Sequence, residues 1–272
     1  MKVVLLLVAA ALACCAADRV LVMAPLCAKS HKVVFMPIVE ALAGRGHQVT
    51  VVTPYRPKAA VANVREIAIG DAMEKVGFDM LSSRKEGGLK QITALFGPFM
   101  TLINMSYTHL MNNDEFRQIL AKPEFDVVIV NCLMNEFVLP LIDGWGVPRI
   151  TFCPASGVTW LLEANGVSPE YASVPGGGVW FGRKMNLLQR AANVLMNKVV
   201  LLMRHFVFLP YMEQLAGQDV TLTRSISDMQ QDDTLMLVAH HLSTAFQRSF
   251  PPNVIPLGGL QLRPARPLPQ AS

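Results

Sequence analysis

Two polar segments each follow a short apolar run typical of a buried strand. LCAKSH (26–31) follows the run Val20–Met23, and NCLMNE (131–136) follows the run Val127–Val130. Parallel strands of an open α/β sheet bring their carboxyl ends to one edge, where ligands bind. His31 is the candidate general base there, because the positive end of a helix disfavours the imidazolium and a neutral imidazole accepts a proton near pH 7. The alternative is a histidine that only packs or caps at a helix start.

The residues after His31 have the spacing of a helix packed on a sheet. Phe35, Ile38, Val39 and Leu42 fall at i, i+3, i+4 and i+7, and Ser30 is the expected N-cap. Glycines at 44 and 46 end this helix, and a second strand is predicted over Val49–Val52. A strand, a helix and a strand in this order predict a βαβ unit with parallel strands.

Later segments continue the alternation. Apolar runs predict strands at Val127–Val130, around Arg149–Phe152 and at Leu235–Val238. Helical patterns lie near 90–96, 99–112, 114–121, 136–143 and 185–203, with a further piece ending near 216. The predicted fold is a Rossmann-like, doubly wound α/β domain with a mostly parallel sheet. Its apolar stretch 199–210 is interrupted by Arg204 and His205, which favours a core helix over a membrane-surface contact.

Composition limits the class of protein. Of 272 residues, 52% are apolar and 16% charged, which excludes disordered, collagenous and coiled-coil proteins. The formal charge of +4 is not concentrated in any segment, so nucleic-acid binding is not favoured. Residues 1–17 read as a secretory signal peptide, with a lipoprotein signal ending at Cys14 as the alternative. We expect one domain over 18–262 and a proline-rich linker over 263–272.

Three cysteines remain after the signal: Cys27, Cys132 and Cys153. Their spacing gives no zinc motif, and we expect mostly buried, isolated thiols, with the pairing of one of them left open. His240 and His241 follow a predicted strand and are expected to be exposed loop residues, with a position facing a cleft as the alternative. Asn104-Met105-Ser106 is a glycosylation sequon, and Asn104 is a weak candidate acceptor.

Three segments in order resemble the UDP-glycosyltransferases of the glucuronosyltransferase type. They are PLCAKSHKVVFMPIVEALAGRGHQVTVVTP, SVPGGGVWFGRKMNLLQRAANVLMN and LVAHHLSTAFQRSFPPNVIPLGGLQLRPARPLP. The second is similar to a family stretch whose fixed positions are here Val174, Pro175, Met185, Arg190 and Asn193. Together the three segments cover nearly all of the chain after the signal.

The resemblance implies the N-terminal, acceptor-binding half of a two-domain GT-B enzyme. It implies inverting transfer of a hexose or glucuronate from a UDP-sugar, with His31 taking the proton of an acceptor hydroxyl. Asn131 stands where the family often has an aspartate that holds the histidine, and Glu136 is the alternative support. The UDP-sugar is a co-substrate, bound mainly by a donor-binding half that this sequence lacks, and no cofactor or metal is implied.

The family's acceptor pocket also implies a set of lining residues, with plain core as the alternative for each: Ser30, Phe96, Phe99, Met100, Trp160, Trp180 and Phe181. Small lipophilic alcohols or phenols are the expected acceptors. The expected location is the lumen of the endoplasmic reticulum, with homo- or hetero-oligomers as possible assemblies. The alternative function is a non-catalytic, lipophile-binding or regulatory fragment that pairs with full-length relatives.

Overall fold

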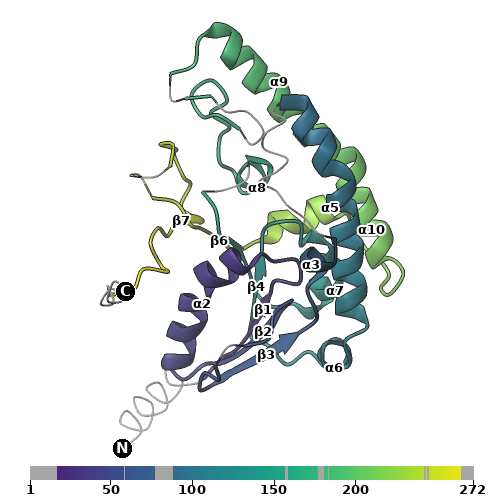
Figure 1. Ribbon diagram of the computed structural model, residues 1–272. Coiled ribbons are helices and arrows are strands. Elements are labelled where there is room, and N and C mark those ends of the chain that lie inside the picture. Colours follow the sequence, from purple (N-terminus) through teal and green to yellow (C-terminus); the bar gives the residue numbers. More distant parts are fainter. Residues whose placement is uncertain are drawn as a thin grey trace, which may run out of the picture.

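A computed structural model describes residues 17–57, 59–76, 88–156, 159–176, 181–182, 184–241, 243 and 245–264, with the backbone alone for 75–76 and 88–96. Within these residues, seven parallel strands form one sheet (Figure 1). They are β1 (Arg19–Met23), β2 (Gln48–Thr53), β3 (Val64–Ala68), β4 (Val127–Asn131), β5 (Arg149–Cys153), β6 (Leu235–Val238) and β7 (Val254–Pro256). The doubly wound α/β prediction is confirmed.

The order of the strands defines the topological switch point of the sheet. The sheet runs β3-β2-β1-β4-β5-β6-β7, so the chain first winds outward from β1 in one direction and then returns to wind from β4 in the other. Val20 pairs with Val49 of β2 on one side and with Val127 of β4 on the other. The crevice at the carboxyl ends of β1 and β4 is therefore the topological switch point.

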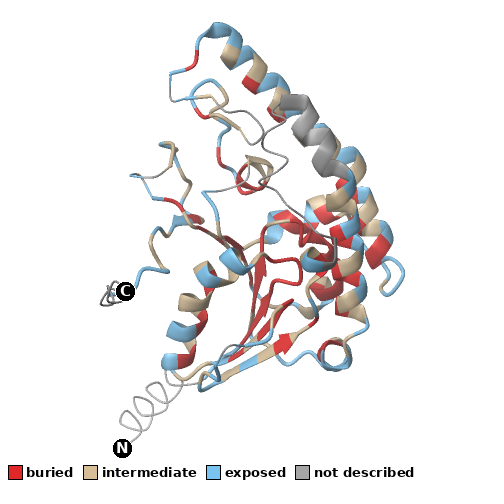
Figure 2. Ribbon diagram, viewed as in Figure 1, coloured by how far each residue is buried: buried red, intermediate tan, exposed pale blue. Residues whose placement is uncertain are grey.

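Side-chain alternation along the strands divides the core between the two faces of the sheet. Helix α2 (Lys29–Gly44) covers one face, where its Phe35 and Val39 pack with Val22 and Ile129. The opposite face is covered by α5 (Gly88–Met111), α6 (Asp114–Ala121), α7 (Leu139–Ile142), α10 (Leu209–Ala216) and α11 (Ile226–Met229). Figure 2 shows the buried residues concentrated in the strands and on the inward sides of these helices.

The remaining short elements lie in the connections. They are α3 (Ala72–Val76), α8 (Thr159–Ala164) and the 3-10 turns η1 (Glu136–Val138), η2 (Asp143–Trp145) and η4 (Gln230–Asp232). The sequence predicted one helix over 136–143, and the structure divides it into η1, α7 and η2. It also predicted two helices on either side of Pro98, whereas α5 runs through this proline as a single helix.

Helix α9 (Leu187–Met203) projects from the sheet and continues through the π-helical turn η3 (Arg204–Phe208) into α10 (Figure 1). Over Leu187–Ala216 this helix has the length and apolar composition to cross a membrane, and 22% of its most apolar window is buried. Phe208 and Leu209 are in the core, but Leu202 and Phe206 are 56% and 68% exposed. The core-helix prediction therefore holds for one side of the 199–210 stretch and is wrong for the other.

Candidate active site at the switch point

His31 lies in the first turn of α2, directly after the loop that leaves β1. The N-cap is Ala28, which makes no side-chain hydrogen bond, so the prediction of Ser30 as N-cap is wrong and Ser30 is an exposed first-turn residue. The Nδ1 atom of His31 is buried and has no hydrogen-bond partner in the described structure. Burial lowers the pKa of His31 below its ordinary value, because the charged form is desolvated. The lowered pKa favours the neutral imidazole that the sequence predicted, and burial is the cause of the shift.

Asn131 is the last residue of β4 and lies on the α2 side of the sheet. It is 2% exposed and lines a small, otherwise apolar cavity together with Phe35 of α2 and Phe152 of β5. His31 is one helical turn before Phe35, so both candidate residues belong to the same end of the α2–sheet interface. The Oδ1 atom of Asn131 accepts the N–H of Leu133 at 3.5 Å, and its Nδ2 atom has no partner in the described structure.

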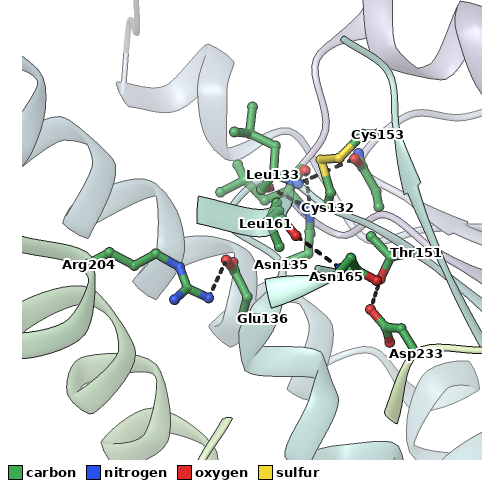
Figure 3. The surroundings of a disulfide bond; sticks show 12 residues. Cys132, Leu133, Asn135, Glu136, Thr151, Cys153, Leu161, Asn165, Arg204 and Asp233 are labelled. Carbon is green, nitrogen blue, oxygen red and sulfur yellow. Dashed lines mark hydrogen bonds and ion pairs between the residues drawn. A yellow bond between two sulfur atoms is a disulfide. The ribbon is translucent and has the colours of Figure 1, made fainter. Parts of the chain in front are cut away.

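No hydrogen bond therefore joins Asn131 to the buried Nδ1 atom of His31. Glu136, the alternative support, forms an ion pair with Arg204 at 3.7 Å (Figure 3). Arg204 also donates to Gln230. Burial raises the pKa of Glu136 and lowers that of Arg204, because each charge is desolvated. The carboxylate of Glu136 thus joins the β4 connection to the α9–α10 helix.

The loop between β1 and α2 is held by contacts that the sequence did not indicate. The hydroxyl of Tyr55 donates to the carbonyl of Cys27 at 2.8 Å, and Lys32 forms a largely buried ion pair with Glu66 of β3. Burial raises the pKa of the Cys27 thiol to about 12, so this cysteine stays protonated and is no nucleophile near pH 7.

Cys132 and Cys153 form a disulfide between β4 and β5, with their Cα atoms 5.1 Å apart (Figure 3). The sequence left one pairing open, and the strand register identifies it. Asn131 pairs with Phe152, so the next residue of each strand stands opposite the other at the carboxyl edge. The disulfide fixes this edge directly beside Asn131.

The predicted acceptor-lining residues lie in four parts of the chain, the first of which is Ser30 at the start of α2. Phe99 and Met100 of α5 and Trp160 of α8 are half-buried and pack against the same core cluster. The indole Nε1 atom of Trp160 is buried and has no partner among the described residues. Phe181 is half-buried. Trp180 and the side chain of Phe96 lie outside the described residues.

The predicted family stretch around Asn193 forms a buried tether. Asn193 of α9 donates to the carbonyls of Tyr171 and Val174 and accepts the N–H of Gly176 at 2.8 Å. A Cβ atom on Gly176 would lie 2.3 Å from the amide of Asn197, so glycine is required there by close packing. This tether holds the 171–176 loop against α9.

Other predicted residues have mixed outcomes. His240 is 3% exposed and packs against Phe250, so the prediction of an exposed loop histidine is wrong for it. The side chain of Asn104 is exposed on α5 and donates to the hydroxyl of Tyr211 at 2.9 Å, whereas Ser106 of the sequon is buried. Glycosylation of Asn104 stays a prediction.

Within the described residues, no group of three or more His, Cys, Asp or Glu side chains is placed to hold a metal ion.

A parallel, doubly wound sheet with helices on both faces defines a Rossmann-like α/β protein, and comparison with known proteins identifies its family. Residues 18–272 match the family model of UDP-glucoronosyl and UDP-glucosyl transferases, and the chain belongs to this family. The predicted resemblance is confirmed.

Curated relatives are only distantly similar in sequence, but the alignments cover most of this chain. The chain is 23% identical to UDP-glycosyltransferase UGT4 of Dactylopius coccus over 93% of its own length and 51% of the relative's. It is 24% identical to human 2-hydroxyacylsphingosine 1-beta-galactosyltransferase, over 93% and 47% of the two chains. For UDP-glucuronosyltransferase 2B7 of Rattus norvegicus the identity is 25%, over 89% and 49%. The chain thus spans about half the length of the relatives it matches.

Solved glycosyltransferases align with the chain at lower similarity. The calicheamicin glycosyltransferase CalG4 is 15% identical with a TM-score of 0.45, over 89% of this chain and 53% of that one. UGT71G1 of Medicago truncatula, complexed with UDP-glucose, is 10% identical with a TM-score of 0.44, over 93% and 54%.

Proposed function

We propose that this chain is the acceptor-binding half of a UDP-glycosyltransferase that transfers a hexose or glucuronate to a hydroxyl of a small lipophilic molecule. The observation that carries the proposal is His31, a half-buried histidine at the switch point of the sheet whose Nδ1 atom is buried and has no partner among the described residues. Family membership supports the donor class, since the family is defined by UDP-sugar transfer.

The proposed reaction needs one proton acceptor from this half. A ring nitrogen of neutral His31 takes the proton of the acceptor hydroxyl while the hydroxyl oxygen forms a bond to the anomeric carbon. The bond from that carbon to the phosphate oxygen breaks, and UDP leaves with the electron pair. Attack opposite the leaving group inverts the anomeric configuration. The lowered pKa of His31 keeps it unprotonated near pH 7, as a general base requires.

Half-buried apolar side chains support the lipophilic acceptor class. Phe99, Met100 and Trp160 present apolar surface, and the unpartnered indole N–H of Trp160 offers a donor for one polar group of an acceptor. Pockets with apolar walls and a few polar groups suit alcohols and phenols with a large apolar body.

The test joins residues 18–272 to the donor-binding half of a curated relative. With UDP-glucose or UDP-glucuronate and a panel of lipophilic alcohols, we expect a β-linked product, detected by mass spectrometry and NMR. The 272-residue chain alone should give none, because it matches only about half of each relative. Product from the chain alone, or none from any joined protein that binds both substrates, would contradict the proposal.

We further propose that the domain matures in the secretory pathway, in the lumen of the endoplasmic reticulum. The Cys132–Cys153 disulfide supports this location, because such bonds persist in oxidising compartments. The first ordered strand begins at Arg19, so removal of residues 1–17 would leave the sheet intact. N-terminal sequencing of protein from eukaryotic cells should start near Asp18, and material that retains Met1 in the cytosol would contradict this.

A further inference from the structure

Asn135 is a fully buried residue, at 0% exposure, whose side chain joins two loops at the switch point. Its Oδ1 atom accepts the N–H of Leu26 at 2.7 Å, and its Nδ2 atom donates to the carbonyl of the same Leu26 at 2.9 Å. The Nδ2 atom also donates to the carbonyl of Leu133 at 2.7 Å. All three bonds are of normal length, and the first two connect residues that are 109 positions apart.

The two hydrogen bonds between Asn135 and Leu26 connect the chain segments that follow β1 and β4. The β1–β4 ladder ends at Met23 and Val130, and beyond that pair the two backbones separate into loops. A carboxamide has the same kinds of donor and acceptor as a peptide group. The side chain of Asn135 therefore pairs with the backbone of Leu26 as a neighbouring strand would. Without it, the N–H and carbonyl of Leu26, whose side chain is only 4% exposed, would be buried unpaired.

The backbone before Asn135 is shaped to deliver this side chain. Met134 has φ 54°, in the left-handed region that side chains other than those of Gly, Asn and Asp seldom adopt. Such a conformation costs on the order of 1 kcal/mol and persists where the surrounding contacts require it. Because Met134 is itself buried and immediately precedes Asn135, this turn directs the carboxamide toward the β1 loop.

Two candidate groups depend on the position of these loops. Leu26 is five residues before His31, and Asn135 is four residues after Asn131. The connection from Leu26 to α2 is short, and the Tyr55–Cys27 bond holds its next residue from the other side. The location of the His31 ring relative to the β4 edge is therefore set where Asn135 binds Leu26.

We propose that Asn135 is a positioning residue, which fixes the β1–α2 loop against the β4 connection and thereby holds His31 in place at the switch point, with its Nδ1 atom out of water. The catalytic relevance of this role rests on the proposed function of His31, whereas the positioning itself does not. Asn135 touches no reacting atom in this account and acts through the backbone of Leu26.

The experiment follows His31 and Leu26 by NMR in the 272-residue chain, without any sugar donor. Asn135→Ala is compared with wild type and with Asn193→Ala, a matched control that is equally buried and also has three side-chain bonds to backbone, but in the 171–176 loop. His31→Gln assigns the ring signals. Lys29 and Lys32 beside His31 on α2, and Glu66, which pairs with Lys32, are the same in all these proteins.

In Asn135→Ala we expect the His31 pKa to rise toward its ordinary value, because a loosened loop lets water reach the ring. Exchange of the Leu26 amide should become about tenfold faster or more, since it loses its buried acceptor. Asn193→Ala should leave both values at those of wild type. A folded Asn135→Ala protein with unchanged His31 titration and Leu26 exchange would overturn the proposal, as would an equal change in Asn193→Ala.

Asn135→Asp serves if the alanine variant does not fold. It keeps an acceptor for the Leu26 N–H but loses both donors and faces two carbonyl oxygens, so the same direction of change is expected. In wild type alone, a Leu26 amide that exchanges as fast as an exposed loop amide would also overturn the proposal. None of these readouts involves transfer, so a failure of His31 as the base would be seen separately, in turnover.

Discussion

At the residue scale, the site is marked by buried polar atoms that lack partners. Nδ1 of His31, Nδ2 of Asn131 and Nε1 of Trp160 are all of this kind in the described structure. Such atoms are rare in native proteins and costly to leave unpaired, because each has lost its water without gaining a hydrogen bond. A missing partner supports a candidate site only together with its place in the fold, because atoms of the same kind occur elsewhere in the described residues: Ser106, Glu136, Arg204 and His240.

The lowered pKa of His31 gives a pH dependence of stability. Because the unfolded chain binds a proton at about pH 6.5 and the folded chain only at lower pH, the unfolded state gains protons first on acidification. The contribution of His31 to stability is thus present above about pH 6.5 and decreases below it. Urea unfolding at pH 7.5 and 5.5 should show a smaller loss of stability in His31→Gln than in wild type, and an equal loss would contradict the burial of the ring.

Asn131→Asp tests whether this strand end can support the base. A carboxylate there should raise the pKa of His31, because a nearby negative charge favours the imidazolium. In the joined two-half enzyme, turnover should be equal to wild type or higher. The measurement is the NMR titration of His31 together with initial rates. A folded variant with an unchanged His31 titration would show that Asn131 does not face the ring.

At the element scale, continuous apolar runs predicted β1, β2, β4, β5 and β6 within one or two residues, because strands buried on both faces need such runs. The edge strand β3 was missed, since Arg65 and Glu66 interrupt its pattern where burial is incomplete. The exposed side of α9 was also missed, since periodicity identifies a helix without saying whether its apolar side is covered. The local sequence thus predicted most strands and helices, but not which of their faces are buried.

Of the features at the candidate site, the sequence likewise predicted some and missed others. The place of His31 at a helix start after β1 was predicted from local order, whereas its role as base was implied by the family resemblance and stays a prediction. Asn135 was not predicted, because its bonds to Leu26 span 109 residues and an asparagine in a turn has no distinctive pattern. The Cys132–Cys153 pairing needed the β4–β5 register, which sequence spacing does not provide. Tertiary contacts therefore supplied what local patterns left open.

The buried Glu136–Arg204 pair connects the β4 turn to the α9–α10 helix and gives an element-scale prediction. Glu136→Leu or Arg204→Met alone should lower the free energy of unfolding by about 3–5 kcal/mol, because each leaves a buried charge uncompensated. The double variant should recover most of this loss. Denaturant unfolding of the four proteins measures the coupling, and losses that simply add would contradict a direct interaction of the two side chains.

At the scale of the whole molecule, the parallel sheet brings parts of the chain that are far apart in sequence to one edge. The β1–α2 loop, the β4 connection and the end of β5 meet there, and the side chain of Asn135 and the Cys132–Cys153 disulfide hold them together. Rigid support suits a general base, whose efficiency depends on its distance to the proton it removes. The fold thus provides a rigid edge for the proposed base, His31.

The most direct test of this account is the turnover of His31→Ala, measured with an alcohol acceptor in the joined two-half enzyme. We predict that kcat falls by ~10²–10⁴, the range typical for loss of a general base, while acceptor affinity changes far less. A phenol acceptor should be less affected, since its lower pKa makes a base less necessary. A folded His31→Ala enzyme that transfers sugar to the alcohol at a near-normal rate would contradict the assignment of His31 as the base.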